Sequence, residues 1–281
     1  MNFYLHKGKI TGHEDFNPRE EWLDGHVPLE IYMWFAHGTI PFFDDHVESI
    51  NRKFTLLGRS YRIGSAEKSE LLRLCLRLIN KNKAFMGGWL KLVVMAAGEV
   101  WPYWASVTRY PSREIPFTDT GKLATFSEYT RFSESGPALT NFGLPAIWEG
   151  ERLRISGTRF GEVIFCNEKG AVTDALGGNI FCVADHQLLT PSQATGCIAD
   201  TFRKLTVSAA LSSGFEVIET ENLKPADLQR MDEIFTVSEK NGFSWILGIG
   251  IKRFVRKKTE KIRDLAEYLL WEGRMTISRK S

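Results

Sequence analysis

The sequence predicts a mixed α/β protein with two domains, and three features of the chain support this class. First, its 281 residues are 43% hydrophobic and 12% aromatic, which is enough to bury a large core and exceeds the usual size of one compact unit. Second, short apolar runs bounded by turn residues predict β-strands. Third, apolar residues spaced three and four apart predict helices between these runs.

Residues 1–110 are predicted to form a small N-terminal α/β domain. We expect strands at residues 2–10, 27–35, 89–95 and 104–108, and helices at residues 44–57 and 66–79. The first helix has acids in its first turn and apolar residues at Val47, Ile50 and Phe54, the pattern of a helix with one buried face. Prolines and charges interrupt the periodicity at residues 111–120, and we interpret this segment as an interdomain linker.

The larger domain, residues 121–281, is organised around the stretch from Gly161 to Leu205. Strands are expected at residues 163–166, up to Asp174 and at 179–183, followed by a helix at 201–213, a strand at 215–218 and a closing helix at 260–271. Unpaired backbone N–H groups and the helix dipole both favour negative charge where a helix begins. The start of the helix after this stretch is therefore a candidate phosphate site.

Charge and hydropathy argue against two classes of partner. Lys and Arg number 36 against 34 Asp and Glu, and a net charge of +2 does not indicate a nucleic-acid partner. The basic run at residues 252–258 precedes a helix pattern and is interpreted as a solvated face. The first residues lack a signal-peptide pattern and no apolar run approaches ~18 residues, so no membrane segment is expected.

Cysteine and histidine spacing gives no sign of a metal site or of disulfides. The cysteines at positions 75, 166, 182 and 197 form no CxxC pair, and the six histidines show no HxH or HxxxH spacing. We therefore expect neither a metal site nor a disulfide framework. Buried thiols are typical of a reducing compartment, so we expect a cytoplasmic protein.

Five short motifs of the central stretch follow one another in a recognisable order. They are Glu162-Val163-Ile164, Gly170 to Asp174, Asn179 to Val183, Leu189-Thr190-Pro191 and Gly196-Cys197-Ile198. In this register the chain resembles the fold-type IV family of pyridoxal-phosphate enzymes, which contains branched-chain and D-amino-acid aminotransferases and aminodeoxychorismate lyase. Further motifs at residues 29–30, 45–47 and 231–236 also fit, so the resemblance extends over most of the chain.

The resemblance implies a fold and a set of ligands. The expected architecture is a small N-terminal α/β domain and a larger C-terminal domain with a β-barrel-like core and flanking helices. The implied cofactor is pyridoxal 5'-phosphate, and the implied assembly is a homodimer with a small-molecule ligand in the interdomain cleft. Tyr32, Lys91 and Tyr103 are expected to line that cleft, and Lys91 matches a strand position at which relatives often carry arginine.

The catalytic lysine of the family has no counterpart in this chain. A pyridoxal enzyme uses a lysine amine to hold the cofactor as an imine and then to move the substrate's α proton. The family position falls on Asn141, or on Gly143 if a short deletion is allowed, and no lysine occurs between Lys122 and Lys169. We therefore assign no catalytic residue and do not expect covalent attachment of the cofactor.

The remaining contacts to the cofactor are altered as well. The family uses a glutamate to keep the pyridine nitrogen of the ring protonated, and the matching residue here is Asp174. In the family the phosphate is held by an arginine, by the start of a helix and by a hydroxyl residue. The positions expected to form the cofactor site with Asp174 are Ser49, Asn179, Asp200, Thr201, Arg203, Ser238 and Glu239.

These positions have lost a cation and gained two acids. The family arginine is replaced by Ser49, while Asp200 and Glu239 fall where the family places phosphate donors. Two unit charges about 4 Å apart interact by about 4 kcal/mol at an effective dielectric near 20, so either carboxylate opposes a phosphate dianion. Arg203 matches an arginine that the family already carries and adds no compensating charge.

Three functions remain open from the sequence. The first is a class IV aminotransferase-like protein that has lost covalent pyridoxal chemistry and is a pseudoenzyme or binds another small ligand. The second is an active aminotransferase or aminodeoxychorismate lyase with an unusual cofactor site. The third is an enzyme of changed chemistry that uses Asp174, Asp200 and Glu239 as acids and bases.

Overall fold

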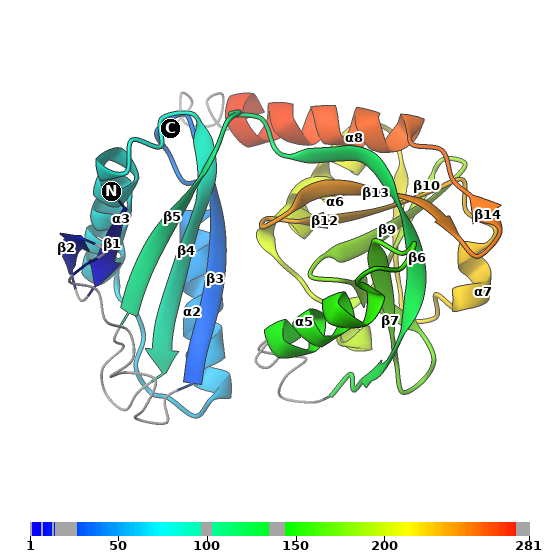
Figure 1. The fold of residues 1–281 in the computed structure, drawn as a ribbon, viewed down its shortest axis with the longest axis horizontal. Coiled ribbons are helices and arrows are strands. Elements are labelled where there is room, and N and C mark those ends of the chain that lie inside the picture. The colour runs from blue at the N-terminus through cyan, green and yellow to red at the C-terminus, as the bar shows by residue number, and fades with distance from the viewer. Residues whose placement is uncertain are drawn as a thin grey trace. The chain divides into compact units, whose positions relative to one another are not determined.

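The computed structural model describes residues 2–6, 8–12, 14, 27–96, 103–134 and 144–273. The chain divides into two compact units, Met1–Glu114, here called unit 1, and Ile115–Ser281, called unit 2. Helices and strands occur in both units (Figure 1). The predicted mixed α/β class is thus confirmed.

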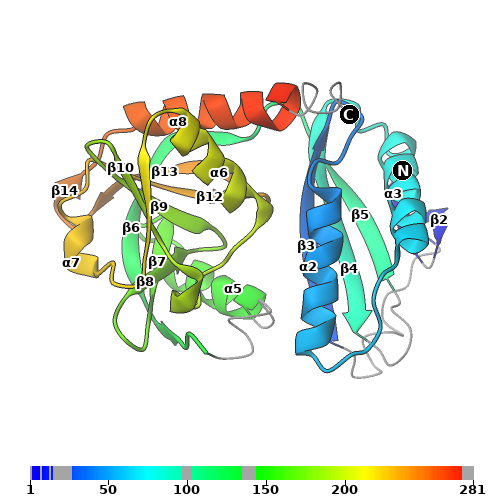
Figure 2. The ribbon, with the colours of Figure 1, turned by 180° about the vertical axis from the view of Figure 1, so that it is seen from behind.

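Unit 1 is an antiparallel sheet covered on one face by two helices. Its strands, in the spatial order β2-β1-β5-β4-β3, are β1 (Phe3–His6), β2 (Lys9–Gly12), β3 (Val27–Ala36), β4 (Gly87–Ala96) and β5 (Tyr103–Tyr110). The covering helices are α2 (Phe43–Leu56) and α3 (Ser65–Lys81), and Figure 2 shows both on the same side of the sheet.

Alternate residues of each strand in unit 1 belong to two different faces, because successive side chains point to opposite sides of a sheet. Residues such as Ile31, Leu92 and Ala105 pack against the helices in one buried core. On the opposite face, Trp34 lies 5.4 Å from Trp89 and 5.7 Å from Tyr110 between ring centroids, in edge-to-face geometry. The face of the sheet that the two helices do not cover therefore carries aromatic side chains.

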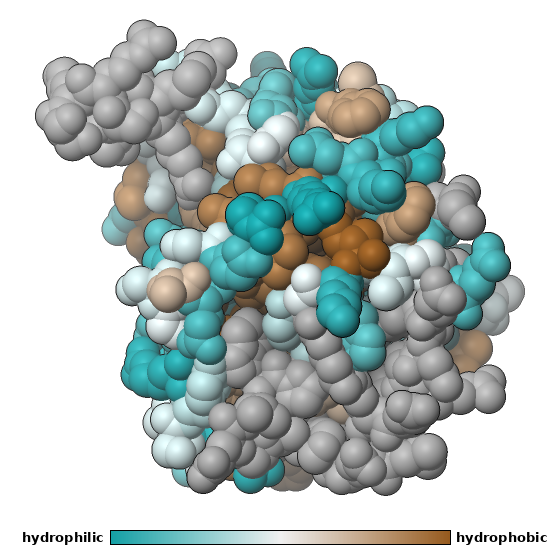
Figure 3. Space-filling model, turned by 90° about the vertical axis from the view of Figure 1, so that its left-hand side faces the viewer, coloured by the Kyte–Doolittle hydropathy of each residue, from teal (hydrophilic) through white to brown (hydrophobic). Residues whose placement is uncertain are grey.

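The side of unit 1 that Figure 3 shows presents both apolar and polar groups. Figure 3 shows hydrophobic side chains gathered near the centre of this side, with hydrophilic side chains around them. Half-buried apolar residues of unit 1, among them Ile10, Leu72 and Leu76, pack against the core from its edge. The core of unit 1 thus reaches close to the surface here.

Unit 2 is a curled mixed sheet with helices around it. Its strands are β6 (Phe117–Arg131), β7 (Glu162–Asn167), β8 (Val172–Ala175), β9 (Asn179–Ala184), β10 (Gln187–Pro191), β11 (Glu216–Thr220), β12 (Glu233–Ser238), β13 (Gly242–Ile249) and β14 (Lys252–Arg253). Its helices are α5 (Leu144–Ile155), α6 (Thr201–Ser212), α7 (Pro225–Leu228) and α8 (Lys257–Tyr268), with short helical turns at Gln193–Thr195 and Leu269–Gly273.

The sheet of unit 2 returns on itself. The strand order is β11-β10-β9-β12-β13-β6-β7-β8, with β14 paired to β13. Although β8 ends this order, its last residue Ala175 forms a bridge with Gly178, directly before β9. The sheet therefore closes from β8 towards β9 around a core that includes Ile164, Ile180 and Ile246. This curl confirms the predicted β-barrel-like core and is visible in Figure 1.

The longest strand of unit 2 was not among the predicted strands. β6 runs for 15 residues, and its pairing with β7 shifts register between Phe126 and Thr130. A register shift breaks the alternation of apolar and polar residues on which sequence-based prediction of strands depends. None of the helices within the described ranges is long and apolar enough to cross a membrane.

A buried carboxylate holds the start of α8 against the sheet. Glu233 of β12 accepts hydrogen bonds from the backbone N–H of Lys258 at 2.8 Å and from the backbone N–H and hydroxyl of Thr259, both at 2.7 Å. The first N–H groups of a helix have no partner within the helix. Glu233 therefore caps α8 from another element of the fold.

Replacing this cap should weaken unit 2. We expect Glu233→Gln to lower the free energy of unfolding by about 1–2 kcal/mol, because the amide removes the charge and turns an N–H towards the helix start. Glu260→Gln is the matched control, since Glu260 forms only a half-exposed pair with Arg256 at 3.0 Å and should change the same quantity by less than about 0.5 kcal/mol. Chemical denaturation measures both, and equal losses would contradict the capping role.

Candidate functional site

The predicted site residues of unit 2 converge on the β8–β9 hairpin and the start of α6. The bridge between Ala175 and Gly178 brings the end of β8 next to the start of β9, so that Asp174 and Asn179 flank this bridge. Both are buried, and we call them together with Asp200 the acid cluster.

Asp174 is held by an arginine and by a backbone N–H. Its Oδ2 atom accepts hydrogen bonds from Arg131 Nη1 at 2.6 Å and from the backbone N–H of Ile198 at 3.3 Å. The second arm of Arg131 donates to the carbonyl of Gly196 at 2.5 Å. The side chains of Asp174 and Arg131 are 0% and 3% exposed, so this ion pair is screened from water.

The other oxygen of Asp174 has no donor. Oδ1 is buried and, within the described residues, accepts no hydrogen bond of ordinary geometry, although the hydroxyl of Thr173 lies close enough to the carboxyl group to lower its pKa. Burial raises the pKa of Asp174 to about 6, and the guanidinium of Arg131 opposes that rise. A donor placed at Oδ1 would stabilise the ionised form of this carboxyl group.

Asn179 presents a second buried acceptor beside it. Its Nδ2 atom donates to Asp200 Oδ1 at 2.9 Å and to the carbonyl of Val237 at 3.1 Å. Because both contacts are acceptors, they determine which end of the amide is nitrogen. The carbonyl oxygen Oδ1 of Asn179 is buried and has no donor among the described residues.

Asp200 places a carboxylate at the start of α6. It is the N-cap residue, and its Oδ1 accepts the backbone N–H of Arg203 at 3.0 Å, while Oδ2 accepts the backbone N–H of Glu239 at 3.1 Å. With the amide of Asn179, three donors converge on this carboxylate. The position at the helix start that favours an anion is therefore occupied by a side chain of the protein itself.

A second acid lies beside this helix start. Glu239 is buried, and its carboxylate accepts a hydrogen bond from the hydroxyl of Thr201, the first residue of α6. Burial and the charge of Glu239 raise the pKa of Asp200 to about 6, although the three donors oppose the rise. The charge of Glu239 thus disfavours the ionised form of Asp200.

Arg203 and Ser238 are engaged within unit 2. The guanidinium of Arg203 donates to Thr190 Oγ1 at 2.8 Å, to the carbonyl of Pro191 at 2.6 Å and to Glu219 at 3.1 Å. Ser238 accepts the backbone N–H of Asn241 in the turn between β12 and β13. Arg203 therefore joins α6 to β10 and β11, and Ser238 supports a turn.

The predicted residues of unit 1 do not share one face. Lys91 Nζ lies 2.5 Å from Glu30 and 5.6 Å from the ring centres of Tyr32 and Trp104. Tyr103 is one residue from Trp104 and belongs to the helix-covered core, because strand residues alternate between faces. Ser49 lies half-buried on α2.

Arg131 is the functional residue that sequence analysis missed. It is the last residue of β6, and its partner Asp174 lies 43 positions further along the chain. Neither a motif nor a periodic pattern links the two residues, so only the parallel pairing of β6 with β7 brings them together. Asn141 and Gly143, the positions matched to the family lysine, lie outside the described residues.

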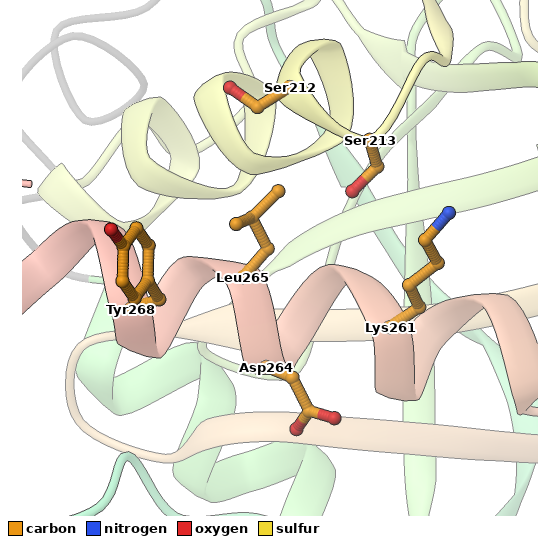
Figure 4. Close-up of a pocket in the computed structure, with 6 residues that line it drawn as sticks. All are labelled: Ser212, Ser213, Lys261, Asp264, Leu265 and Tyr268. Atoms are coloured by element: carbon orange, nitrogen blue, oxygen red, sulfur yellow. The ribbon is translucent and has the colours of Figure 1, made fainter.

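A shallow groove elsewhere in unit 2 does not include any predicted site residue. It has a volume of about 420 Å³ between the end of α6 and α8, and is lined by Ser212, Ser213, Lys261, Asp264, Leu265 and Tyr268 (Figure 4). Among the described residues, no three His, Cys, Asp or Glu side chains are grouped so as to hold a metal ion. The acid cluster is therefore the better candidate site.

A small α/β unit followed by a curled sheet that presents an acid beside a helix start defines the aminotransferase-like class of pyridoxal-enzyme folds. The chain belongs to the class IV amino-transferase family, whose model matches residues 30–242. The resemblance inferred from the motifs is thereby confirmed. No curated protein sequence matches the chain significantly.

Solved structures with the same fold cover almost the whole chain. The Escherichia coli branched-chain amino acid aminotransferase superimposes with a TM-score of 0.80 at 16% identity, over 96% of this chain and 94% of that one. A putative 4-amino-4-deoxychorismate lyase from Legionella pneumophila gives 0.74 at 16% identity, over 86% and 91%. A hypothetical Mycobacterium tuberculosis aminotransferase with α-ketoglutarate and PMP bound gives 0.79 at 15% identity, over 97% and 100%. At these identities the likeness shows the fold.

Removing the guanidinium that neutralises Asp174 should destabilise unit 2 strongly. We expect Arg131→Met to lower the free energy of unfolding by about 3–5 kcal/mol, because it leaves a buried carboxylate without a counter-charge. Adding Asp174→Asn in the same chain should recover part of this loss. Chemical denaturation of the two single variants and the double variant gives the coupling energy.

Arg152→Met is the matched control for this cycle. Arg152 pairs with Glu149 on α5 at 3.3 Å, with both side chains exposed to water, so its loss should cost less than about 1 kcal/mol. If Arg131→Met costs no more than this control, or if the double variant shows the simple sum of the single losses, the buried pair does not have the role assigned to it.

The raised pKa of Asp200 should appear as a pH-dependent difference in stability. Its folded-state pKa of about 6 lies above the ordinary value of 3.8, so the folded protein binds the proton more tightly. The resulting stabilisation is complete below the unfolded pKa and is lost as pH rises through the folded pKa. The Asp200→Asn side chain cannot ionise. As pH rises from 5 to 8, the free energy of unfolding of this variant should therefore increase by about 1 kcal/mol relative to that of the wild type.

The new amide turns an N–H towards the backbone N–H of Glu239, and this contact destabilises the variant by the same amount at every pH. Comparing the variant with the wild type at two pH values cancels this constant contribution. Chemical denaturation at both pH values measures the free energy of unfolding of the two proteins. A difference between variant and wild type that stays the same at pH 5 and pH 8 would show that Asp200 titrates at its ordinary pKa.

Proposed function

We propose that this member of the class IV amino-transferase family has lost covalent pyridoxal-phosphate chemistry and is a pseudoenzyme or binds a different small ligand. The observation that carries the proposal is the position of Asp200. Its carboxylate takes three hydrogen bonds at the start of α6, where the family holds the cofactor phosphate.

Pyridoxal phosphate fits only one end of this site. The unpartnered Oδ1 of Asp174, beside Arg131, suits the protonated ring nitrogen of a pyridine. The phosphate end does not suit a dianion, because the carboxylate of Asp200 caps the helix start and Glu239 adds a buried acid beside it. The cofactor as a whole therefore does not fit the residues present.

The missing amine supports the same proposal. No lysine occurs between Lys122 and Lys169, so the part of the chain that carries the imine-forming lysine in the family offers no such group. An imine requires a primary amine that attacks the aldehyde carbon. Loss of the amine and occupation of the anion site together remove the covalent bond and the phosphate contacts.

The alternative function is an active branched-chain or D-amino-acid aminotransferase, or an aminodeoxychorismate lyase, with an unusual cofactor site. One observation favours it: the ion pair of Asp174 with Arg131 keeps a carboxylate available for a protonated ring nitrogen. Relatives with this fold include a branched-chain aminotransferase solved in its PLP form.

We further propose a homodimer in the cytoplasm. The dimer follows from membership of the family, and the ligand is a small molecule. The four cysteines are free and three of them are buried, which supports a reducing compartment.

Absorption spectroscopy with borohydride tests the proposed function. We expect the purified protein, mixed with pyridoxal 5'-phosphate, to show only the spectrum of the free aldehyde and to carry no added mass after borohydride reduction and desalting. The Escherichia coli branched-chain aminotransferase, treated in parallel, is the positive control for the imine band. A stoichiometric, borohydride-fixed pyridoxyl adduct on one residue of this protein would refute the proposal.

A further inference from the structure

We infer that the acid cluster binds a small protonated nitrogen base that carries no phosphate group. This inference deepens the proposed function and rests on it, since it names the ligand class of the same site. Three properties of the described residues support it: two buried acceptors without donors, an excess of acids, and a helix start that is already filled.

The two buried acceptors belong to one hydrogen-bonded cluster. Asp174 Oδ1 and Asn179 Oδ1 both lack a donor among the described residues, and their residues flank the bridge between Ala175 and Gly178 and bind the same loop before α6. A buried acceptor without a partner destabilises a protein by about 1–3 kcal/mol. One ligand with two N–H groups, such as a protonated heteroaromatic amine, satisfies both oxygens.

The charges around these acceptors favour a cation. Asp174 and Glu239 are buried acids, Asp200 is a half-buried one, and Arg131 is the cation paired with Asp174. The charge of Arg203 is shared with Glu219. A positive ligand therefore lowers the repulsion between the acids, and it favours the ionised forms of Asp174 and Asp200.

The carboxylate at the helix start disfavours a phosphate ester. Backbone N–H groups of Arg203 and Glu239 and the amide of Asn179 all donate to Asp200. An anion at this end would have to displace the side chain from all three donors and then lie beside Glu239. Phosphate on an otherwise suitable base should therefore weaken binding, whereas in an ordinary anion site at a helix start it strengthens it.

The loop from Gly196 to Asp200 joins the two halves of the cluster. Gly196 accepts from Arg131, Ile198 donates to Asp174, and Asp200 binds Asn179. A base bound at Asp174 and Asn179 therefore contacts side chains that the hydrogen bonds of this loop already hold in place.

Pyridoxamine and pyridoxamine 5'-phosphate test this inference, because they differ only in the phosphate ester. Isothermal titration calorimetry at neutral pH should show that the full chain binds pyridoxamine at least tenfold more tightly than the phosphate ester. Neither compound is an aldehyde, so the result does not depend on imine formation. Equal or tighter binding of the phosphate ester, or no binding of either compound, would overturn the ligand class.

Substitutions test which residues contact the bound base. Asp174→Asn should weaken pyridoxamine binding about tenfold or more, and Asp200→Gly should bring the two affinities together by freeing the helix start. Asp264→Asn is the matched control, since Asp264 lies in the groove between α6 and α8 and should not change either affinity. Retention of full affinity in a folded Asp174→Asn protein, or a loss in the control, would place the ligand elsewhere. A fixed pyridoxyl adduct would instead refute the proposed function.

Discussion

The hydrogen bonds of Asp200 are the constraint on which the candidate site depends. A carboxylate at the start of a helix is stabilised by unpaired N–H groups and by the helix dipole. Here the same carboxylate also binds the amide of Asn179 on β9 and the backbone of Glu239 after β12. One side chain thus connects α6 to two strands of the sheet, and it does so at the place where an anionic ligand would otherwise bind.

The Asp174–Arg131 ion pair forms the other end of the candidate site. Two charges removed from water are costly unless their remaining hydrogen-bonding groups are satisfied, and Arg131 meets this condition by also donating to Gly196. Asp174 keeps one oxygen without a donor. On the proposed function, the site keeps a polar position for a ligand at one end, while a side chain of the protein lies at the other end.

Most elements of the fold were predictable because local patterns agree with the tertiary structure. The predicted helices at 44–57, 66–79 and 201–213 correspond to α2, α3 and α6 within a few residues. β6 was not predicted, because its register shift against β7 and its polar residues conceal the alternation of a strand. The closing of the sheet from β8 to β9 depends on contacts between segments, and no local pattern encodes it.

Residues of the candidate site could be named from the sequence, except Arg131, but their bonding could not. The register of the motifs against the family pattern named Asp174, Asn179 and Asp200. Charge counting then predicted that Asp200 would oppose a phosphate, and the structure adds the reason that the side chain turns inwards and caps its own helix. A surface-facing aspartate would only have repelled an anion. An inward-facing one also takes the donors an anion needs, so removing the charge alone, as in an asparagine variant, would not reopen the site.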